Sequence, residues 1–483
     1  MTQQANSEAY EGLPGRALVP LSLCGAEIAL RERMTMSKTK VSLGVTGRIV
    51  AVAATYSLPI AVLLYLVCIN IDEFISFAQY EVDGNAYQRP IEAALEAVQE
   101  HQLVLHECHG QASCRARLVA IAAQGSKAFE TIESVDSRLA SRLQFTVPGL
   151  AARGRDHVRG TTVPDEWKVL VARAALVTAS IPADLDELYV HVVGDLRTMI
   201  THVGDTSNLI LDPDLDSYYL MDVTLLALPQ TQDRLGKLAA FGYDALARGS
   251  LTARERTTLA VDAALLQEAD VDRVVGSAKT ATNEDAHFYG QSASLQANLA
   301  PAIAAYKAAA EHFGGLMNKI AEEEHPSVSA ADFLAAGLTA RSASFRTWDV
   351  AVGELDTLLG YRIDAYFRRL VWALVLAGLA VLVSSIVAFA VMRSITRPLV
   401  KLARSLGPGA TLLGECVARI ASAYQDKTTT TEQAEVICDE LSAHADDMRS
   451  AVSELVALVA GRAPEQPSPT ISGPSKPPLR IAS

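Results

Sequence analysis

The chain has few aromatic residues, few cysteines and no excess of basic charge. Aromatic side chains make up 6% of its 483 residues, and six cysteines are spread over that length. Small proteins held together by disulfides carry cysteine at a much higher density, so that class is excluded. The 42 Lys and Arg residues are outnumbered by 55 Asp and Glu residues. Because binding to nucleic-acid phosphates requires a basic surface, we expect no nucleic-acid partner.

Signatures of common enzyme classes are also missing. The sequence contains no P-loop of the form GxxxxGK[ST], no HExxH zinc helix and no cyclase signature. His444 lies in a predicted helix, but no nucleotide-binding domain follows it, which excludes a histidine kinase. No nucleophile elbow or pair of acids indicates an extracytoplasmic hydrolase. The sequence therefore predicts a protein that is not an enzyme and needs no cofactor.

Two long apolar runs, residues 49–69 and 370–392, contain no charged side chain. Each has about the ~20 residues that an α-helix needs to cross a bilayer. Basic residues precede the first run and follow the second, which places both chain ends in the cytoplasm. We expect a cytoplasmic segment at 1–48, transmembrane helices at 49–70 and 370–392, and a periplasmic region at 71–369, in the inner membrane of a bacterium.

Some features of these runs leave alternatives open. Arg362, Arg368 and Arg369 lie on the outer side of the second run and weaken the charge asymmetry. A buried core helix is the alternative for either run. A cleaved signal peptide is the alternative for the first, although no small-x-small site follows it. Met34 and Met36 are alternative starts to Met1.

The outer region has the pattern of packed helices. Apolar residues recur there at spacings of three and four, with no convincing alternation of two. Thr252 and Glu255 have the spacing of a capping box, and Ser329 with Asp332 comes close to it. We therefore predict an all-α protein: two transmembrane helices, an antiparallel helical bundle outside the membrane and a short cytoplasmic coiled coil. The expected outer helices are 71–106, 112–144, helices over 165–208 interrupted at Pro182, one that starts at Asp212–Pro213, and one from about 330.

Three segments have patterns typical of a family of receptors. The first reads IDEFISFAQYEVDG (71–84), the second NLILDPDLDSYYLMD (208–222) and the third RSITRP (393–398). Together they resemble bacterial methyl-accepting chemotaxis proteins, and the third is similar to the entry of a HAMP segment. The resemblance implies a helical periplasmic sensor whose spans are coupled to the interior. The chain departs from the family at 100–106, where its usual His-Arg-Gly step is missing, so a ligand role for that Arg cannot be transferred.

The second segment supplies the candidate site residues. Its acidic residues imitate the opening of a calcium loop, but Ser217 and Val223 stand where that loop needs Gly and Glu. We therefore interpret the acids as the first turn of a helix, where they interact favourably with the helix dipole. Tyr218 and Tyr219 are expected to pack into the bundle and are also candidates for ligand contact. The motif residues are Asp212, Pro213, Asp214, Asp216, Tyr218, Tyr219 and Asp222.

Two cysteines, Cys108 and Cys114, lie on the predicted turn between the first two outer helices. In an oxidising periplasm such neighbouring thiols usually pair, so we expect a disulfide. With His106 and His109 beside them they form an alternative metal site, because imidazole and thiolate bind zinc and copper. Free thiols are a third alternative. The cysteines expected to be reduced and unpaired are Cys24, Cys68, Cys416 and Cys438.

The segment after the second span is too short for the long cytoplasmic hairpin of a chemoreceptor. We expect a degenerate HAMP-like linker at 393–430, a coiled-coil helix at 431–460 and a disordered Pro-rich tail at 461–483. Most of the output hairpin would then be missing, through deletion or an error in the predicted gene. The apolar positions of the coiled coil alternate spacings of four and three: Ala434, Cys438, Leu441, Ala445, Met448, Val452, Leu455 and Val459.

These features predict a receptor that senses a small molecule or a protein outside the membrane and relays the signal through its second span. The coiled coil would associate as a homodimer or as a mixed dimer with other receptors. Two alternatives stay open. One is a non-signalling membrane scaffold or receptor remnant. The other is a sensor subunit that acts through a separate kinase bound to residues 410–460.

Overall fold

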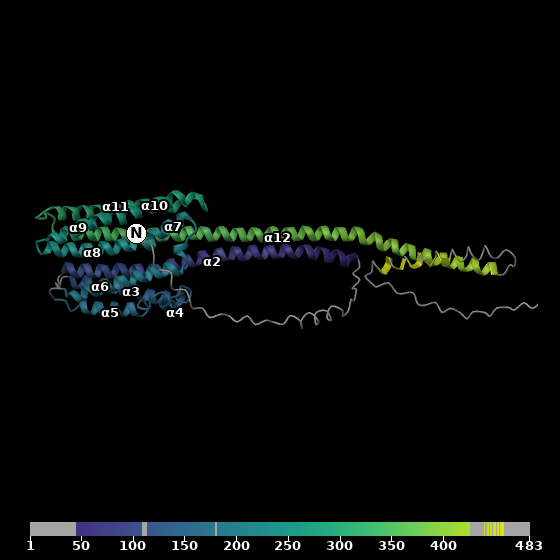
Figure 1. Ribbon diagram of the computed structural model, residues 1–483, viewed down its shortest axis with the longest axis horizontal. Coiled ribbons are helices and arrows are strands. Elements are labelled where there is room, and N and C mark those ends of the chain that lie inside the picture. Colours follow the sequence, from purple (N-terminus) through teal and green to yellow (C-terminus); the bar gives the residue numbers. More distant parts are fainter. Residues whose placement is uncertain are drawn as a thin grey trace, which may run out of the picture. The chain divides into compact units, whose positions relative to one another are not determined.

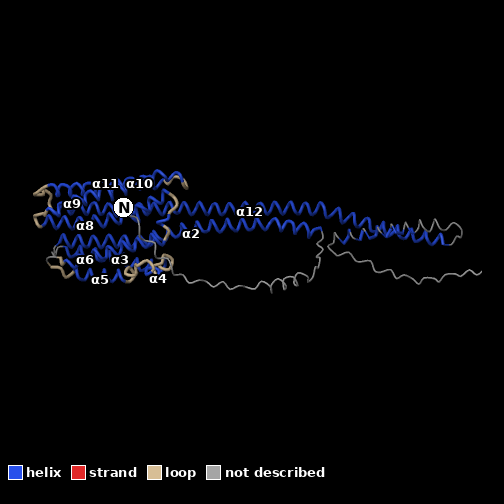
Figure 2. The backbone as a smooth tube through the Cα atoms, viewed as in Figure 1, coloured by secondary structure: helices blue, strands red, loops and turns tan. Residues whose placement is uncertain are grey.

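A computed structural model describes residues 45–108, 114–178 and 181–425, together with single positions between 439 and 457. The described residues form helices joined by turns, with no strand among them, which confirms the all-α prediction for this part of the chain (Figure 2). The α-helices, labelled in Figure 1, are α2 Val45–Cys108, α3 Arg115–Leu139, α4 Val147–Ala151, α5 Thr162–Ala174, α6 Ala183–Thr206, α7 Leu215–Met221, α8 Leu228–Ala247, α9 Ala253–Leu265, α10 Asp272–Glu284, α11 Ala293–Glu322 and α12 Ala330–Gln425. Four short helical segments of other types are η2 Leu209–Leu211, η3 Asp222–Ala227, η4 Leu266–Val271 and η5 Asp285–His287.

Helices α2 and α12 are long and apolar enough to cross a membrane. They contain the two apolar runs expected to be spans. Side chains of these runs point away from the protein, and Leu63 and Leu379 are 63% and 54% exposed. A continuous apolar surface of this kind is unfavourable in water and is typical of contact with lipid. These helices are therefore the candidate membrane spans of the chain.

The chain divides into two compact units. One unit, residues 62–378, holds α3 to α11 and the adjoining parts of α2 and α12. The other holds the remaining described residues, in which α12 continues as a helix through most of the expected 393–430 linker. The predicted coiled coil at 431–460 lies largely, and the tail at 461–483 wholly, outside the described residues. So does nearly all of the N-terminal segment 1–48.

Within the 62–378 unit, α2 and α12 run antiparallel and are in contact. The ring of Phe74 stacks on that of Tyr366 with 5.2 Å between centroids. Further along, Arg341 Nη1 donates a hydrogen bond of 3.0 Å to the carbonyl oxygen of Glu96. Elsewhere in the unit, α5 packs on α6, α9 on α11 and α7 on α10. One large apolar core runs through these helices, and a small separate cluster consists of Val104, Cys108 and Ile121.

Local sequence signals set several helix boundaries. At the start of α9, Thr252 Oγ1 accepts a hydrogen bond from the Glu255 amide at 3.2 Å, and Glu255 Oε2 accepts one from the Thr252 amide at 2.8 Å. This confirms the predicted capping box. At the start of α12, Ser329 Oγ accepts from the Asp332 amide at 3.0 Å. The helix expected at 112–144 is shorter in the structure, where α3 begins at Arg115 and ends at Leu139.

Two π-helical segments were not expected from the sequence. One, η3, joins α7 to α8, and the other, η4, joins α9 to α10. A π turn disrupts the regular hydrogen bonding of an α-helix, and a buried carbonyl group needs a partner. In η3, the Thr224 carbonyl accepts hydrogen bonds from Gln88 Nε2 at 2.7 Å and Trp348 Nε1 at 2.8 Å. Side chains of α2 and α12 therefore meet at this wider turn.

Candidate functional site

A buried cluster of one cation and three carboxylates lies where α2, α12 and the segment before α7 meet. We call it the Arg362 cluster; its members are Arg362, Glu81, Asp212 and Asp214. Arg362 Nη1 lies 2.7 Å from Glu81 Oε2. Its Nη2 lies 2.6 Å from Asp212 Oδ1, and its Nε lies 2.6 Å from Asp214 Oδ2. Nη2 also donates to the hydroxyl of Ser217. The planar guanidinium, with five N–H donors, thus joins three segments of the chain.

The Arg362 cluster has more acidic than basic groups, and burial decides which acid is neutral. Burial, and next the charge of Asp212, raise the pKa of Glu81 to about 9 against the lowering effect of Arg362. Burial also raises the pKa of Asp212. Burial lowers the pKa of Arg362, but the carboxylates outweigh this and raise it, so the guanidinium stays charged. Glu81 Oε1 has no hydrogen-bond partner among the described residues, so no donor stabilises a negative charge on that oxygen.

The segment between α6 and α7 positions the two aspartates by a tight local fold. Asn208 adopts the left-handed conformation, with φ of 66°, immediately before the short helix η2. Asn tolerates this conformation better than most residues. Asp212 Oδ1 then accepts hydrogen bonds from the Asp214 amide at 3.0 Å and from Ser217 Oγ at 2.9 Å. This Asx-type turn starts α7 and fixes the Asp212 carboxylate toward α12.

The other acidic and aromatic motif residues have separate surroundings. Asp216 is buried, and burial raises its pKa to about 6. Asp222, at the start of η3, lies 2.6 Å from Arg273 on α10. Tyr219 is half-buried, but Tyr218 is 37% exposed, so the expectation that both tyrosines pack into the bundle is wrong for Tyr218. The structure places neither tyrosine in the Arg362 cluster.

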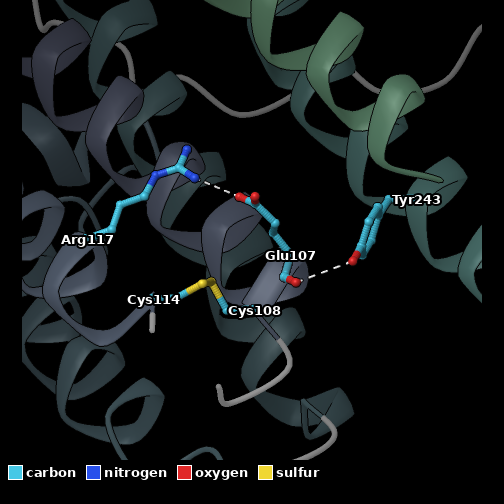
Figure 3. The surroundings of a disulfide bond; sticks show 5 residues. All are labelled: Glu107, Cys108, Cys114, Arg117 and Tyr243. Atoms are coloured by element: carbon cyan, nitrogen blue, oxygen red, sulfur yellow. Dashed lines mark hydrogen bonds and ion pairs between the residues drawn. A yellow bond between two sulfur atoms is a disulfide. The ribbon is translucent and has the colours of Figure 1, made fainter. Parts of the chain in front are cut away.

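A disulfide joins Cys108, at the end of α2, to Cys114, immediately before α3 (Figure 3). Their Cα atoms are 5.8 Å apart. Beside it, the Glu107 carboxylate lies 2.7 Å from Arg117 on α3. The Glu107 carbonyl accepts a hydrogen bond of 3.3 Å from the Tyr243 hydroxyl on α8 (Figure 3). The disulfide and its neighbours therefore hold the end of α2 against α3 and α8.

His106 does not share a metal site with these cysteines. Its Nε2 lies 2.8 Å from Asp186 and its Nδ1 lies 3.0 Å from Asp244, while both cysteine sulfurs are used by the disulfide. Burial lowers the pKa of His106, but the two carboxylates outweigh this and raise it to about 9. A protonated imidazole cannot bind a metal ion. The fourth residue of the alternative metal site, His109, lies outside the described residues.

Of the remaining cysteines, Cys68 in α2 is a free thiol, as expected. Cys24 and Cys438 lie outside the described residues. Cys416 belongs to α12.

The sequence does not predict that Glu81 and Arg362 are partners. In the sequence, Arg362 is one of three basic residues on the outer side of the second apolar run. One signal was present: Arg362 follows the buried Leu355 and Leu359 at spacings of seven and three, which places a charge on the buried face of a helix. A buried charge requires a partner of opposite sign, although the sequence does not say which acid supplies it.

No known protein family, characterised protein or solved structure matches this chain. Its function is therefore inferred from its own residues.

Proposed function

We propose that the protein is a transmembrane signal-transducing receptor of the chemotaxis type, and not an enzyme. Residues 71–369 sense a periplasmic ligand, and the second span, 370–392, relays the signal to a short cytoplasmic coiled coil. The receptor resides in a bacterial inner membrane with both termini in the cytoplasm. It acts as a homodimer or as a mixed dimer with other receptors.

The Arg362 cluster is the observation that carries this proposal. It connects α2 to α12, the two helices that contain the apolar runs. Arg362 lies about two helical turns before the second run begins, and Glu81 lies about three turns after the first one ends. Sliding of α12 along α2 must therefore break or rearrange buried ion pairs close to the membrane.

A buried ionic cluster is suited to switching between discrete arrangements. Each charged group must keep a partner once water is excluded, so intermediate positions of the helices are unfavourable. Arg362 has three carboxylates within reach, and a proton can reside on Glu81 or on Asp212. Exchange of partners would accompany a small displacement of α12, the kind of motion by which packed helices transmit signals. A ligand that binds one arrangement better shifts the equilibrium toward it.

Thermal unfolding of the full-length protein in lipid nanodiscs tests the sensing part of this proposal. The protein would be heated with each of a panel of organic acids, amino acids and nitrate, in the presence of a metal chelator. A compound that binds the native state at 100 times its Kd adds about 2.7 kcal/mol of stability and raises Tm. We expect such a rise with one chemical class. No rise across the panel would contradict small-molecule sensing and favour a protein ligand or an inert scaffold.

A further inference from the structure

A second cluster of titratable side chains joins α5, α6 and the segment before α5. We call it the Asp195 cluster; its members are Glu166 on α5, His191 and Asp195 on α6, and His157 before α5. His191 Nε2 lies 3.4 Å from Glu166 Oε1 and 3.7 Å from Asp195 Oδ2. His157 Nε2 lies 3.8 Å from Asp195 Oδ1. Donor atoms of Glu166, His191 and Asp195 all lie within 4.8 Å of one another.

The histidine–carboxylate distances are longer than hydrogen bonds and suit atoms that share a metal ion, whereas the Glu166 and Asp195 carboxyl groups lie close enough to share a proton when no metal is bound. Hydrogen bonds between nitrogen and oxygen have lengths of about 2.7–3.2 Å. Around a tetrahedral ion with bonds of about 2.0 Å, neighbouring ligand atoms are about 3.3 Å apart. The nitrogen–oxygen separations in the Asp195 cluster are 3.4, 3.7 and 3.8 Å, so the shortest is close to that value and the others are slightly longer. The donor atoms of Glu166, His191 and Asp195 already lie within 4.8 Å of one another, so small side-chain movements would bring these three to that spacing.

Asp195 is buried and lacks a permanent hydrogen-bond donor at one of its oxygens. Its side chain is only 5% exposed, and no N–H or hydroxyl group of the described residues donates to its Oδ2. The same holds for the buried Oε2 of Glu166. Among the described residues, the ion-pair partners of these two carboxylates are histidines rather than Lys or Arg. A buried carboxylate without a firm cationic partner is unfavourable unless it is neutralised or bound to a metal.

The pKa shifts of the two acids in the Asp195 cluster also favour a metal site. Burial, and next the charge of Asp195, raise the pKa of Glu166. Burial raises the pKa of Asp195 as well, although His191 and His157 lower it. Both acids are therefore held in surroundings that disfavour their negative charge. A divalent cation between them would remove that penalty.

We infer that the Asp195 cluster binds a divalent transition-metal ion of the zinc class. His191 and Asp195 are four residues apart on α6, so they lie on one face of the helix. Glu166 reaches them from α5, which packs against α6, and His157 offers a fourth donor. Imidazole and carboxylate are ordinary zinc ligands in a four-coordinate site. The ion would tie α5 and the segment before it to α6, and this inference is independent of the proposed receptor function.

Metal titration of the full-length protein tests the inference. The protein would carry no polyhistidine tag and would be stripped with a chelator and dialysed in detergent. Zn²⁺ would then be titrated in a calorimeter, and Co²⁺ would be followed by its visible d–d absorption. We expect one Zn²⁺ per chain, and a Co²⁺ spectrum with the intensity of a four-coordinate ion.

Two ligand variants and one control variant test whether Zn²⁺ binds at the Asp195 cluster. Removal of one ligand in His191→Ala or Asp195→Asn is expected to weaken Zn²⁺ binding by at least about tenfold, since even outer-shell changes cost that much. The control is His287→Ala, because His287 forms an isolated, exposed pair with Glu284 at 3.2 Å. It should bind Zn²⁺ as the wild type does.

One of these variants also shows whether weaker Zn²⁺ binding results from misfolding. Asp195→Asn keeps the size of the side chain and removes a buried charge that only two exposed histidines offset, so its metal-free Tm should equal or exceed that of the wild type. The inference is overturned if no Zn²⁺ binds, or if His191→Ala and Asp195→Asn bind it as tightly as His287→Ala.

Discussion

Replacement of Arg362 by methionine is predicted to destabilise the folded protein by about 3–5 kcal/mol, the usual result of removing one partner from a buried ion pair. Methionine fills much of the same space but leaves Glu81, Asp212 and Asp214 buried without a cation. All three lie 2.6–2.7 Å from the guanidinium, so we expect a value toward the upper end of that range. At about 2 °C per kcal/mol for a region of this size, Tm should fall by about 6–10 °C.

Two matched variants show whether the loss comes from the buried charges. Because the pKa of Glu81 is raised to about 9, its side chain is already neutral at pH 7, and Glu81→Gln preserves both size and charge. That variant should lose no more than about 1 kcal/mol, the value of a single hydrogen bond. Arg173→Met removes an exposed ion pair with Asp184 and should also lose at most about 1 kcal/mol.

The Tm difference between the wild type and Arg362→Met should also depend on pH. Without Arg362, the folded-state pKa of Asp212 lies above its unfolded-state value, because burial raises it and no cation offsets that effect. Such groups stabilise the native state at low pH and lose that contribution as pH rises through the folded-state pKa. The Tm deficit of Arg362→Met should therefore narrow as pH falls from about 8 to about 5.

The assay is thermal unfolding of the full-length variants in one detergent, followed by circular dichroism. If Arg362→Met loses no more stability than Arg173→Met, the buried cluster does not hold the two helices together. If Glu81→Gln loses as much as Arg362→Met, the assignment of the proton to Glu81 is wrong.

Three further predictions concern sites outside the Arg362 cluster. The pKa of His106 is raised from an ordinary 6.5 to about 9, so protonated His106 should stabilise the fold by about 3 kcal/mol. This stabilisation is complete below about pH 6.5 and is lost as pH rises through about 9. The Tm values of the wild type and His106→Gln should therefore converge at alkaline pH. Loss of the Cys108–Cys114 disulfide in the double serine variant should lower the unfolding free energy by about 2 kcal/mol, and reductant should then have no further effect on it. Thr252→Ala should lose about 1 kcal/mol in chemical denaturation through the missing N-cap of α9, and an unchanged midpoint would contradict that role.

Features that depend on neighbouring residues could be predicted from the sequence. The capping box at Thr252 and Glu255 needs only the right pair three positions apart, and it forms as expected. The disulfide closes a separation of six residues, so its two cysteines are near each other whatever the rest of the fold. The apolar runs are equally local, because span length and composition are read directly from the chain.

Long-range partnerships could not be predicted in the same way. Glu81 and Arg362 are 281 positions apart, and helical periodicity shows only that each faces a core. The π-helical segment η3 depends on Gln88 and Trp348 reaching the Thr224 carbonyl from two other helices. The exposure of Tyr218 depends on which helices pack around α7, which the sequence of a single helix does not reveal.

The most direct test of signal transmission is the cross-linking rate between cysteines introduced at Phe74 and Tyr366. These residues lie between the Arg362 cluster and the two apolar runs, and their rings stack at 5.2 Å. The full-length protein in nanodiscs would keep its disulfide but carry serine at its other cysteines. A compound that raises Tm is predicted to change the cross-linking rate several-fold, and Arg362→Met should abolish that response. A compound that raises Tm and leaves the rate unchanged would contradict transmission of the signal through α12.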